Sequence, residues 1–268
     1  MRVASLGSGS KGNATLVDTG ETLILIDCGL PRKEVEARLA VRGVSATDID
    51  AILITHEHGD HCSGVVSLSS AHKLPVFLTS GTACSAKLDG LRHGVIIRPG
   101  DRFDVGDCHI AAEPVPHDAR EPVQFCLWSG SLKLGVLTDL GSITPHVVHA
   151  FSGCDALILE FNHDPVKLAE GSYPRSVKAR VGGDYGHLAN VQARAFLDYA
   201  DTTRLKMLFV AHISQQNNAP DLADAALADW PGLNNCHVVH ATQEGGFDWV
   251  DLAAGALGPI TRVSAQAS

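Results

Sequence analysis

The feature that most constrains this chain is the segment HEHGDH at residues 56–61, in which His56, His58, Asp60 and His61 are potential metal ligands. It directly follows an apolar run at residues 51–55, and continuous hydrophobicity of this kind is typical of a strand buried on both faces of a sheet. Alternate side chains of an extended segment point to the same side, so His56 and His58 can reach one ion. The pattern therefore predicts a metal site at the end of a buried strand.

Gly59 predicts a turn within this segment, and the turn lets Asp60 and His61 face a second ion nearby. Neutral imidazole and carboxylate groups are good ligands for zinc, and they also suit iron and manganese. The competing interpretation is a surface turn that happens to be rich in histidine. The density of ligand types in so short a stretch favours the metal site.

Short apolar runs alternate with helix-like segments along most of the 268 residues. The apolar runs predict strands at residues 2–6, 14–18, 23–27, 51–55, 75–78, 108–114, 124–128, 132–137, 156–161, 206–211 and 237–241. Helical spacing and capping signals predict helices at residues 31–42, 64–71, 147–151, 191–199 and 222–228.

The predicted strands occur in clusters, and helices lie between the clusters rather than after each strand. This order favours two mixed β-sheets packed together with helices outside, an α/β chain of four layers, over a doubly wound parallel sheet. We expect residues 1–268 to form a single domain. The Ala/Gly/Ser-rich stretch at about residues 253–268 is expected to be a frayed tail.

The composition supports a globular core, with 45% hydrophobic and 19% charged residues. The sequence contains no apolar run of about 18 residues that could cross a bilayer, and its first ten residues turn polar at once. The seven cysteines are odd in number and scattered, without a C-x-x-C pair, which suits reduced thiols. We therefore expect a cytoplasmic protein without a membrane partner.

The net charge of −9 argues against broad binding to nucleic acid, which needs a basic face. Two bound divalent cations would add positive charge that this count omits. A local basic excess marks the place where we expect contacts with backbone phosphates, although such a run is more often a solvated face. Its members are Lys167, Arg175, Lys178, Arg180 and Arg194.

The segment at residues 56–61 resembles the H-x-H-x-D-H signature of the metallo-β-lactamase superfamily, whose fold is an αββα sandwich. In that family a histidine, a bridging aspartate and a last histidine follow at strand ends. Matching residues are His117 in VPHD, Asp139 in LTDLG and His212 in VAHIS, each directly after a predicted strand. Each of them alone would more easily be structural, but their order and placement support one another.

The resemblance implies a site for two divalent metal ions, with zinc favoured and manganese or iron as alternatives. His187 and His240 compete with His212 for the place of the last ligand. In the implied assignment, His56, His58 and His117 hold one ion, Asp60, His61 and His212 hold the other, and Asp139 bridges the two.

Several short strings resemble the YycJ (WalJ) branch of the superfamily, which is described as an exonuclease acting on DNA. They are SGSKGN at 8–13, EFNHD at 160–164, GHLAN at 186–190 and HISQQNN at 212–218. The histidine before the last ligand, His187, is also similar to tRNase Z, a phosphodiesterase that cuts RNA. The resemblance implies a nucleic acid substrate and assigns Ser10, Asn13 and Asn162 to substrate contacts.

The loop at residues 8–13 has glycines for close approach and backbone N–H groups that can cradle phosphate. A plain hairpin turn explains it equally well. The loop lacks the Gly-Lys-Ser/Thr ending of a P-loop, so we expect no nucleotide cofactor.

A site of this kind would hydrolyse a phosphodiester through a metal-bridging hydroxide that attacks phosphorus. Asp60 could orient or deprotonate the water. His187 is the candidate that protonates the leaving oxygen, because imidazole exchanges protons near neutral pH. Asp118 and Glu160 could accept hydrogen bonds from ligand imidazoles, or they could be ordinary carboxylates at strand ends.

Three other functions fit the same fold or site. A glyoxalase II-like thioesterase or another small-ester hydrolase would keep the metals and change the substrate. An iron-bound redox module would usually need a flavin domain, for which the chain has no room. A metal-stabilised regulatory or binding protein without turnover would normally have lost a ligand, whereas this sequence offers a residue for every ligand position.

Overall fold

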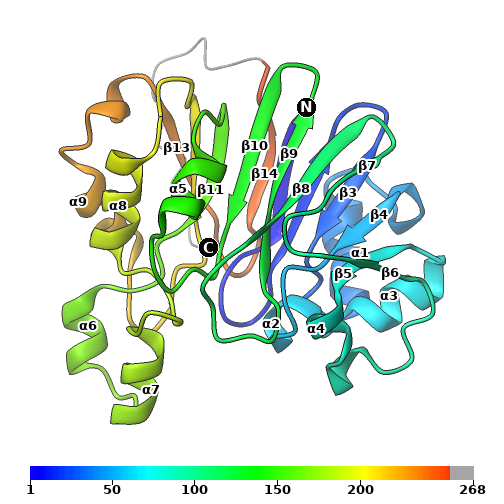
Figure 1. Ribbon diagram of the computed structural model, residues 1–268, viewed down its shortest axis with the longest axis horizontal. Coiled ribbons are helices and arrows are strands. Elements are labelled where there is room, and N and C mark those ends of the chain that lie inside the picture. Colours follow the sequence, from blue (N-terminus) through cyan, green and yellow to red (C-terminus); the bar gives the residue numbers. More distant parts are fainter. Residues whose placement is uncertain (254–268) are drawn as a thin grey trace.

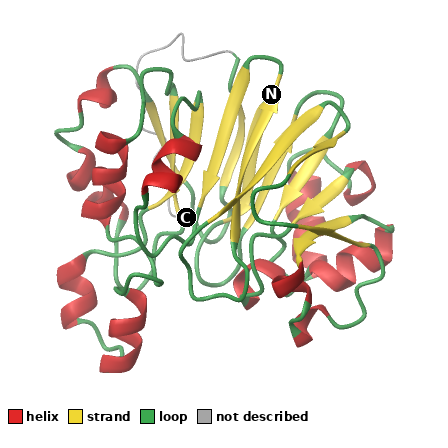
Figure 2. Cartoon of the chain, viewed as in Figure 1, coloured by secondary structure: helices red, strands yellow, loops and turns green. Residues whose placement is uncertain are grey.

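The computed structural model describes residues 1–253, which form two sheets packed face to face with helices against both outer faces (Figure 1, Figure 2). This architecture confirms the predicted αββα sandwich. The predicted tail lies outside the described residues, apart from Ala253. In the described part, no helix combines the length and the apolar character needed to cross a bilayer.

The first sheet contains seven strands in the order β14-β1-β2-β3-β4-β5-β6. Neighbours from β14 to β3 run antiparallel, and neighbours from β3 to β6 run parallel. The parallel strands therefore end at one common edge of the sheet. The strands are β1 (Arg2–Gly7), β2 (Ala14–Asp18), β3 (Leu23–Ile26), β4 (Ala51–Leu53), β5 (Val76–Thr79), β6 (Gly94–Ile97) and β14 (Phe247–Asp251).

The second sheet also contains seven strands, in the order β13-β12-β11-β10-β9-β8-β7. Neighbours from β7 to β10 run antiparallel and those from β10 to β13 run parallel, so this sheet repeats the plan of the first. The strands are β7 (Arg102–Val105), β8 (Cys108–Pro114), β9 (Val123–Ser129), β10 (Leu132–Leu137), β11 (Ala156–Glu160), β12 (Met207–Ala211) and β13 (His237–His240).

Helices bury apolar faces against each sheet. Against the first sheet lie α1 (Arg32–Val41) and α3 (Val65–His72). Against the second lie α5 (Pro145–Phe151), α8 (Asn190–Tyr199) and α9 (Pro220–Leu227). At one end of the sandwich lie the short helices α2 (Gly59–Cys62), α4 (Ser80–Ala83), α6 (Pro165–Glu170) and α7 (Arg175–Val181) (Figure 1). Three single 3-10 turns occupy Ala46–Asp48, Ala86–Leu88 and Pro231–Asn234.

Three layers of apolar contacts explain why the strands read as continuous hydrophobic runs. In β12, Phe209 points between the sheets, whereas its neighbours Leu208 and Val210 point toward the helices. In β3, Ile24 and Leu25 divide between the two faces in the same way. Because both faces of these strands are buried, apolar residues are required at every position rather than at every second one.

The elements that the sequence pattern failed to predict lie at sheet edges or in short helices. The edge strand β6 exposes three of its four residues and has only the short apolar run at residues 95–97. The partly buried strands β7 and β14 are interrupted by charged residues. Helix α7 has no buried residue and therefore no apolar face. The predicted strand at residues 51–55 ends at Leu53, two residues early, and the predicted turn at Gly59 is the first residue of α2.

Candidate metal centre

The predicted ligands meet at the end of the sandwich where the parallel strands of both sheets end. His56 follows β4 in the first sheet, and Asp139 and His212 follow β10 and β12 in the second. Asp60 and His61 lie on α2, whose single turn begins at Gly59. Ligands at the carboxyl ends of parallel strands are the usual arrangement in open α/β sheets. In this protein the carboxyl ends of the parallel strands in the two sheets face one another.

The structure brings all seven sequence-predicted ligand residues together. Nε2 of His61 lies 3.1 Å from one carboxylate oxygen of Asp139, and Nε2 of His117 lies 3.8 Å from the other oxygen. Asp139 thus lies between two ligand groups, within each of which the ligand atoms lie no more than 4.8 Å apart. These two groups, which share no residue, are His56, His58 and His117, and Asp60, His61 and His212. Three further groups among the described residues overlap with them and add Asp139, His187 and Glu160.

Nitrogen atoms in this cluster lack the partners that buried polar atoms normally have. Within residues 1–253, Nε2 of His56 and both ring nitrogens of His212 make no hydrogen bond although they are buried. Nδ1 of His56 is hydrogen-bonded to the Thr55 hydroxyl at 2.9 Å, which leaves Nε2 to face the cluster. Inward-facing imidazole nitrogens without a hydrogen bond fit metal ligands, because a cation would complete them.

The electrostatics of the cluster favour bound cations. Burial lowers the pKa of His56 well below its ordinary value, which keeps this imidazole in the neutral form that binds metal. Burial alone would also lower the pKa of His212, but the carboxylates of Asp139, Asp60 and Glu160 raise it to about 10. The same carboxylates would stabilise a divalent cation, which would displace protons from the imidazoles.

Asp27 supports the ligand His61 and is a residue of the site that the sequence analysis missed. Its carboxylate lies 2.7 Å from Nδ1 of His61 and accepts a hydrogen bond from the Thr55 hydroxyl at 2.9 Å. A carboxylate at Nδ1 fixes the imidazole ring and directs Nε2 toward the metal position. The available signal was an aspartate directly after the apolar run of β3, and nothing in the sequence linked it to His61.

Backbone strain is concentrated at this site. Four non-glycine residues among those described have a positive φ, and three of them belong to the cluster or its support. They are Asp27 with φ 59°, Asp139 with φ 53° and His212 with φ 53°. Such a conformation costs on the order of 1 kcal/mol or more for a non-glycine residue, and it persists where surrounding contacts enforce it. Each of these residues directly follows a strand or lies one residue beyond it, where the turn aims the side chain inward.

His187 and Glu160 lie beside the metal ligands. Nδ1 of His187 is 3.1 Å from a carboxylate oxygen of Glu160 and 3.6 Å from one of Asp139. Glu160 is fully buried, and the backbone N–H of Leu188 donates to it at 3.3 Å. His240, in contrast, pairs with Asp224 at 2.9 Å and belongs to none of the ligand groups.

Asp118 lines the pocket near the first ligand group, and the hydrogen bond to a ligand imidazole that the sequence suggested for it stays a prediction. Its carboxylate oxygen is 3.5 Å from Nε2 of His117 and 3.7 Å from Nε2 of His58. The other oxygen accepts a hydrogen bond from Nε of Arg180.

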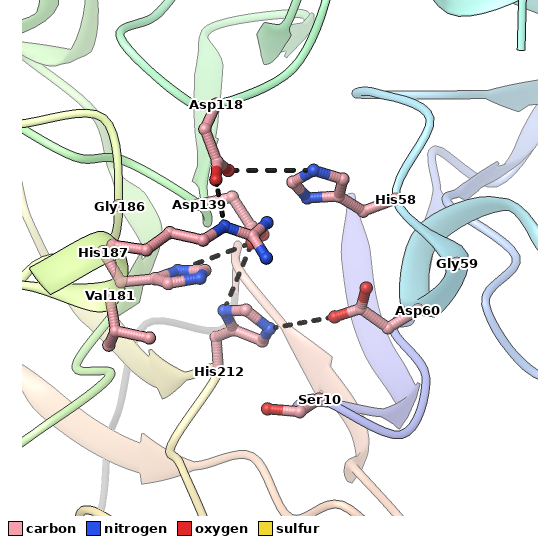
Figure 3. Close-up of a pocket in the computed structure, with 11 residues that line it drawn as sticks. Ser10, His58, Gly59, Asp60, Asp118, Asp139, Val181, Gly186, His187 and His212 are labelled. Atoms are coloured by element: carbon pink, nitrogen blue, oxygen red, sulfur yellow. Dashed lines mark hydrogen bonds and ion pairs between the residues drawn. The ribbon is translucent and has the colours of Figure 1, made fainter. Parts of the chain in front are cut away.

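The three residues assigned to substrate contacts occupy different positions. Ser10 is exposed at the rim of the pocket (Figure 3). Asn13 is buried, its amide nitrogen donates to the Asp60 carbonyl at 3.2 Å, and its amide oxygen accepts from the N–H of Gly9 at 2.7 Å. The buried Asn162 donates to the carbonyl of His212 at 3.2 Å. Both asparagines thus support the loops that carry ligands, and their contacts with substrate stay predictions.

A pocket of about 270 Å³ opens over the cluster (Figure 3). Of the basic residues singled out in the sequence, Arg180 lines this pocket, whereas Arg194 pairs with Asp198 on α8. The pocket wall is otherwise strongly polar. Its lining residues are Ser10, His58, Gly59, Asp60, Asp118, Asp139, Arg180, Val181, Gly186, His187 and His212.

Two facing mixed sheets with a histidine and aspartate cluster between their carboxyl edges define a class of metal-binding αββα protein. The family model described as the metallo-beta-lactamase superfamily matches residues 7–212, and the chain belongs to this superfamily. The metallo-β-lactamase fold protein YhfI from Bacillus subtilis superimposes with a TM-score of 0.71 at 17% identity, covering 93% of this chain and 99% of that one.

Within the superfamily the chain groups with the YycJ and WalJ proteins. It is 33% identical over 227 residues to exodeoxyribonuclease YycJ of Bacillus anthracis, covering 81% of this chain and 84% of that protein. It is 30% identical over 231 residues to exodeoxyribonuclease WalJ of Streptococcus pneumoniae, covering 84% of this chain and 86% of that protein. The resemblance drawn from the short sequence strings is thereby confirmed.

Replacing Asp27 by asparagine tests the support of His61. Asparagine tolerates the positive φ at this position, so the Asp27→Asn chain is expected to fold. The substitution removes the negative charge next to Nδ1 of His61, and we therefore expect metal affinity to fall about 10- to 100-fold. The measurement is competition with a fluorescent chelator. Asp104→Asn, which alters an exposed aspartate–histidine pair outside the cluster, is the matched control. Equal metal affinity of the two variants would contradict the role of Asp27.

Proposed function

We propose that this protein is a metal-dependent phosphodiesterase that hydrolyses nucleic acid, with DNA as the first substrate to test. The observation that carries the proposal is the position of Asp139, a buried carboxylate between two groups of ligand residues. Two metal ions clamped in this way are a recurrent arrangement in enzymes that cleave phosphate esters. The similarity to two exodeoxyribonucleases over most of the chain supports the same substrate class.

The proposed ligand assignment follows the two groups around Asp139. Imidazole nitrogen dominates both groups, which favours zinc over magnesium or calcium, and manganese or iron remain alternatives. His56, His58 and His117 would hold the first ion, and Asp60, His61 and His212 would hold the second. Asp139, which lies beside both groups, would be shared between them.

Divalent cations in this position supply Lewis acidity toward the phosphoryl oxygens and make an attacking water more acidic. The residues of the chain do the rest of the work. Burial would raise the pKa of Asp60, but the charges of His61 and His212 outweigh burial and lower it to about 2, so the carboxylate is available to orient the water. His187 faces the same pocket and donates a proton to the leaving oxygen. Glu160 at Nδ1 leaves Nε2 of His187 for this task.

The pair of His187 and Glu160 also separates the proposal from a thioesterase. An alkoxide leaving group of a nucleic acid requires a proton, whereas a thiolate leaves readily without one. A buried glutamate that orients a histidine at the pocket wall is therefore useful for a phosphodiester and unnecessary for a thioester. A non-catalytic metal protein would not need this pair at all.

The central test is hydrolysis of bis-p-nitrophenyl phosphate, then of end-labelled DNA and RNA, with metal removed by chelator and added back. We expect turnover that is lost with the chelator and restored by zinc or manganese. Asp139→Asn keeps the side-chain shape and tolerates φ 53°, and it is expected to lower both turnover and bound metal at least about 100-fold. Asp104→Asn is the control. Hydrolysis that persists in the absence of metal would sink the proposal.

His187→Ala is expected to spare metal content and to slow the chemistry. A positioned general acid contributes about 10²- to 10⁴-fold to a rate. p-Nitrophenolate leaves without being protonated, so the loss should be large for DNA and small for bis-p-nitrophenyl phosphate. The readouts are kcat on both substrates and metal content by elemental analysis, with His109→Ala, an exposed histidine away from the pocket, as control. An equal loss on both substrates would remove His187 from the proton transfer.

A further inference from the structure

Arg180 is a cation at the pocket wall that the metal centre itself does not explain. It is the next-to-last residue of α7 and lines the pocket together with Asp60 and His187. Only its Nε is used in the contact with Asp118, and the guanidinium carries four further N–H donors. Its side chain is 62% exposed, so those donors are open to solvent and to a ligand in the pocket.

The backbone of α7 is locked to the metal centre despite its lack of a buried face. The N–H of His187 donates to the carbonyl of Val181 at 2.8 Å. A Cβ atom added to Gly186 would lie 2.2 Å from the carbonyl oxygen of Arg180, so only glycine permits this close packing. The carbonyl of Gly186 in turn accepts a hydrogen bond from Nδ1 of the ligand His117 at 3.0 Å. Arg180 is therefore held at a fixed place relative to the ligands.

A guanidinium in this place has an electrostatic consequence. The cluster attracts cations, and bound divalent ions would repel a neighbouring guanidinium. Asp118 offsets part of this repulsion on one side of Arg180. The remaining donors of Arg180 are open to the pocket, which Asp60 and Ser10 also line. An anion placed between Arg180 and the ions would be attracted to both. A planar guanidinium matches the oxygens of a phosphate particularly well.

We propose that Arg180 binds a non-bridging oxygen of the substrate phosphate in this pocket, and that Asp118 positions it by holding Nε. This inference rests on the proposed function and deepens it, because it names the residue that selects a phosphate ester. A neutral carbonyl ester would gain nothing from this charge. Arg180 contacts the substrate directly, whereas Asp118 is a positioning residue.

The test compares Arg180→Ala with Arg204→Ala. Arg204 is a matched control, because it is also an exposed arginine held by one carboxylate, that of Asp155, and it does not line the pocket. The first measurement is calorimetric binding of thymidine 5′-monophosphate to the metal-loaded protein, which needs no turnover. We expect Arg180→Ala to weaken binding about tenfold or more, as for a lost hydrogen bond to a charged group, and Arg204→Ala to change it less than twofold.

Two further measurements separate phosphate recognition from a structural effect. Binding of thymidine, which has no phosphate, should not change in Arg180→Ala, and metal content should stay at the wild-type level. Arg180→Lys keeps the charge but loses the fork of donors, so it should recover only part of the affinity. In steady-state cleavage of single-stranded DNA, Arg180→Ala should lower kcat/KM about tenfold or more.

The inference is overturned if Arg180→Ala binds the monophosphate within twofold of Arg204→Ala, if it loses metal, or if the wild-type protein does not bind the monophosphate. Failure of the proposed function has a different signature. The wild-type protein would then bind metal and cleave neither bis-p-nitrophenyl phosphate nor DNA nor RNA, whatever residue 180 is.

Discussion

The buried carboxylate of Asp139 is the constraint on which the site depends. It is buried at the base of the pocket, and the charges of His212 and His61 outweigh burial to hold its pKa well below the ordinary value. An isolated charge in such a place costs several kcal/mol, so it is tolerable only beside positive charge. Ligands from both sheets supply the imidazoles, and bound cations would supply the rest. The cluster therefore depends on the two sheets packing face to face.

The candidate metal site lies at one end of the sandwich because the parallel strands of both sheets have their carboxyl ends there. Each ligand loop leaves a buried strand that is itself fixed by apolar contacts on both faces. That rigidity is what sustains the positive φ at Asp27, Asp139 and His212. Packing energy in the layers is thus used to hold strained turns, and these turns aim the side chains at a common point.

A second consequence of the architecture is that the pocket wall and the ligands are mechanically linked. Helix α7 has no apolar face of its own, yet its end packs on Gly186, and Gly186 accepts from His117. The position of His187 and Arg180, which are proposed to contact the substrate, is therefore fixed relative to the cluster. The metal centre and the surface proposed to receive the substrate form one unit, built from loops of the second sheet and from the loop after β4 and helix α2 on the side of the first sheet.

The sequence by itself determined the fold class and the side chains that gather at the candidate metal site. Buried strands require apolar runs, and the candidate ligands stand in one dense string or closely after a strand. It could not reveal Asp27 as the partner of His61, since that contact joins residues 34 apart and has no local pattern. The edge strands β6 and β7 also escaped prediction, because each has only four residues, too few for a pattern to stand out, and helix α7 escaped because it has no buried face. Only the tertiary structure decided that Asn13 and Asn162 support loops and that Arg180, among several basic residues, reaches the pocket. These outcomes depend on distances between remote segments, which composition and spacing do not encode.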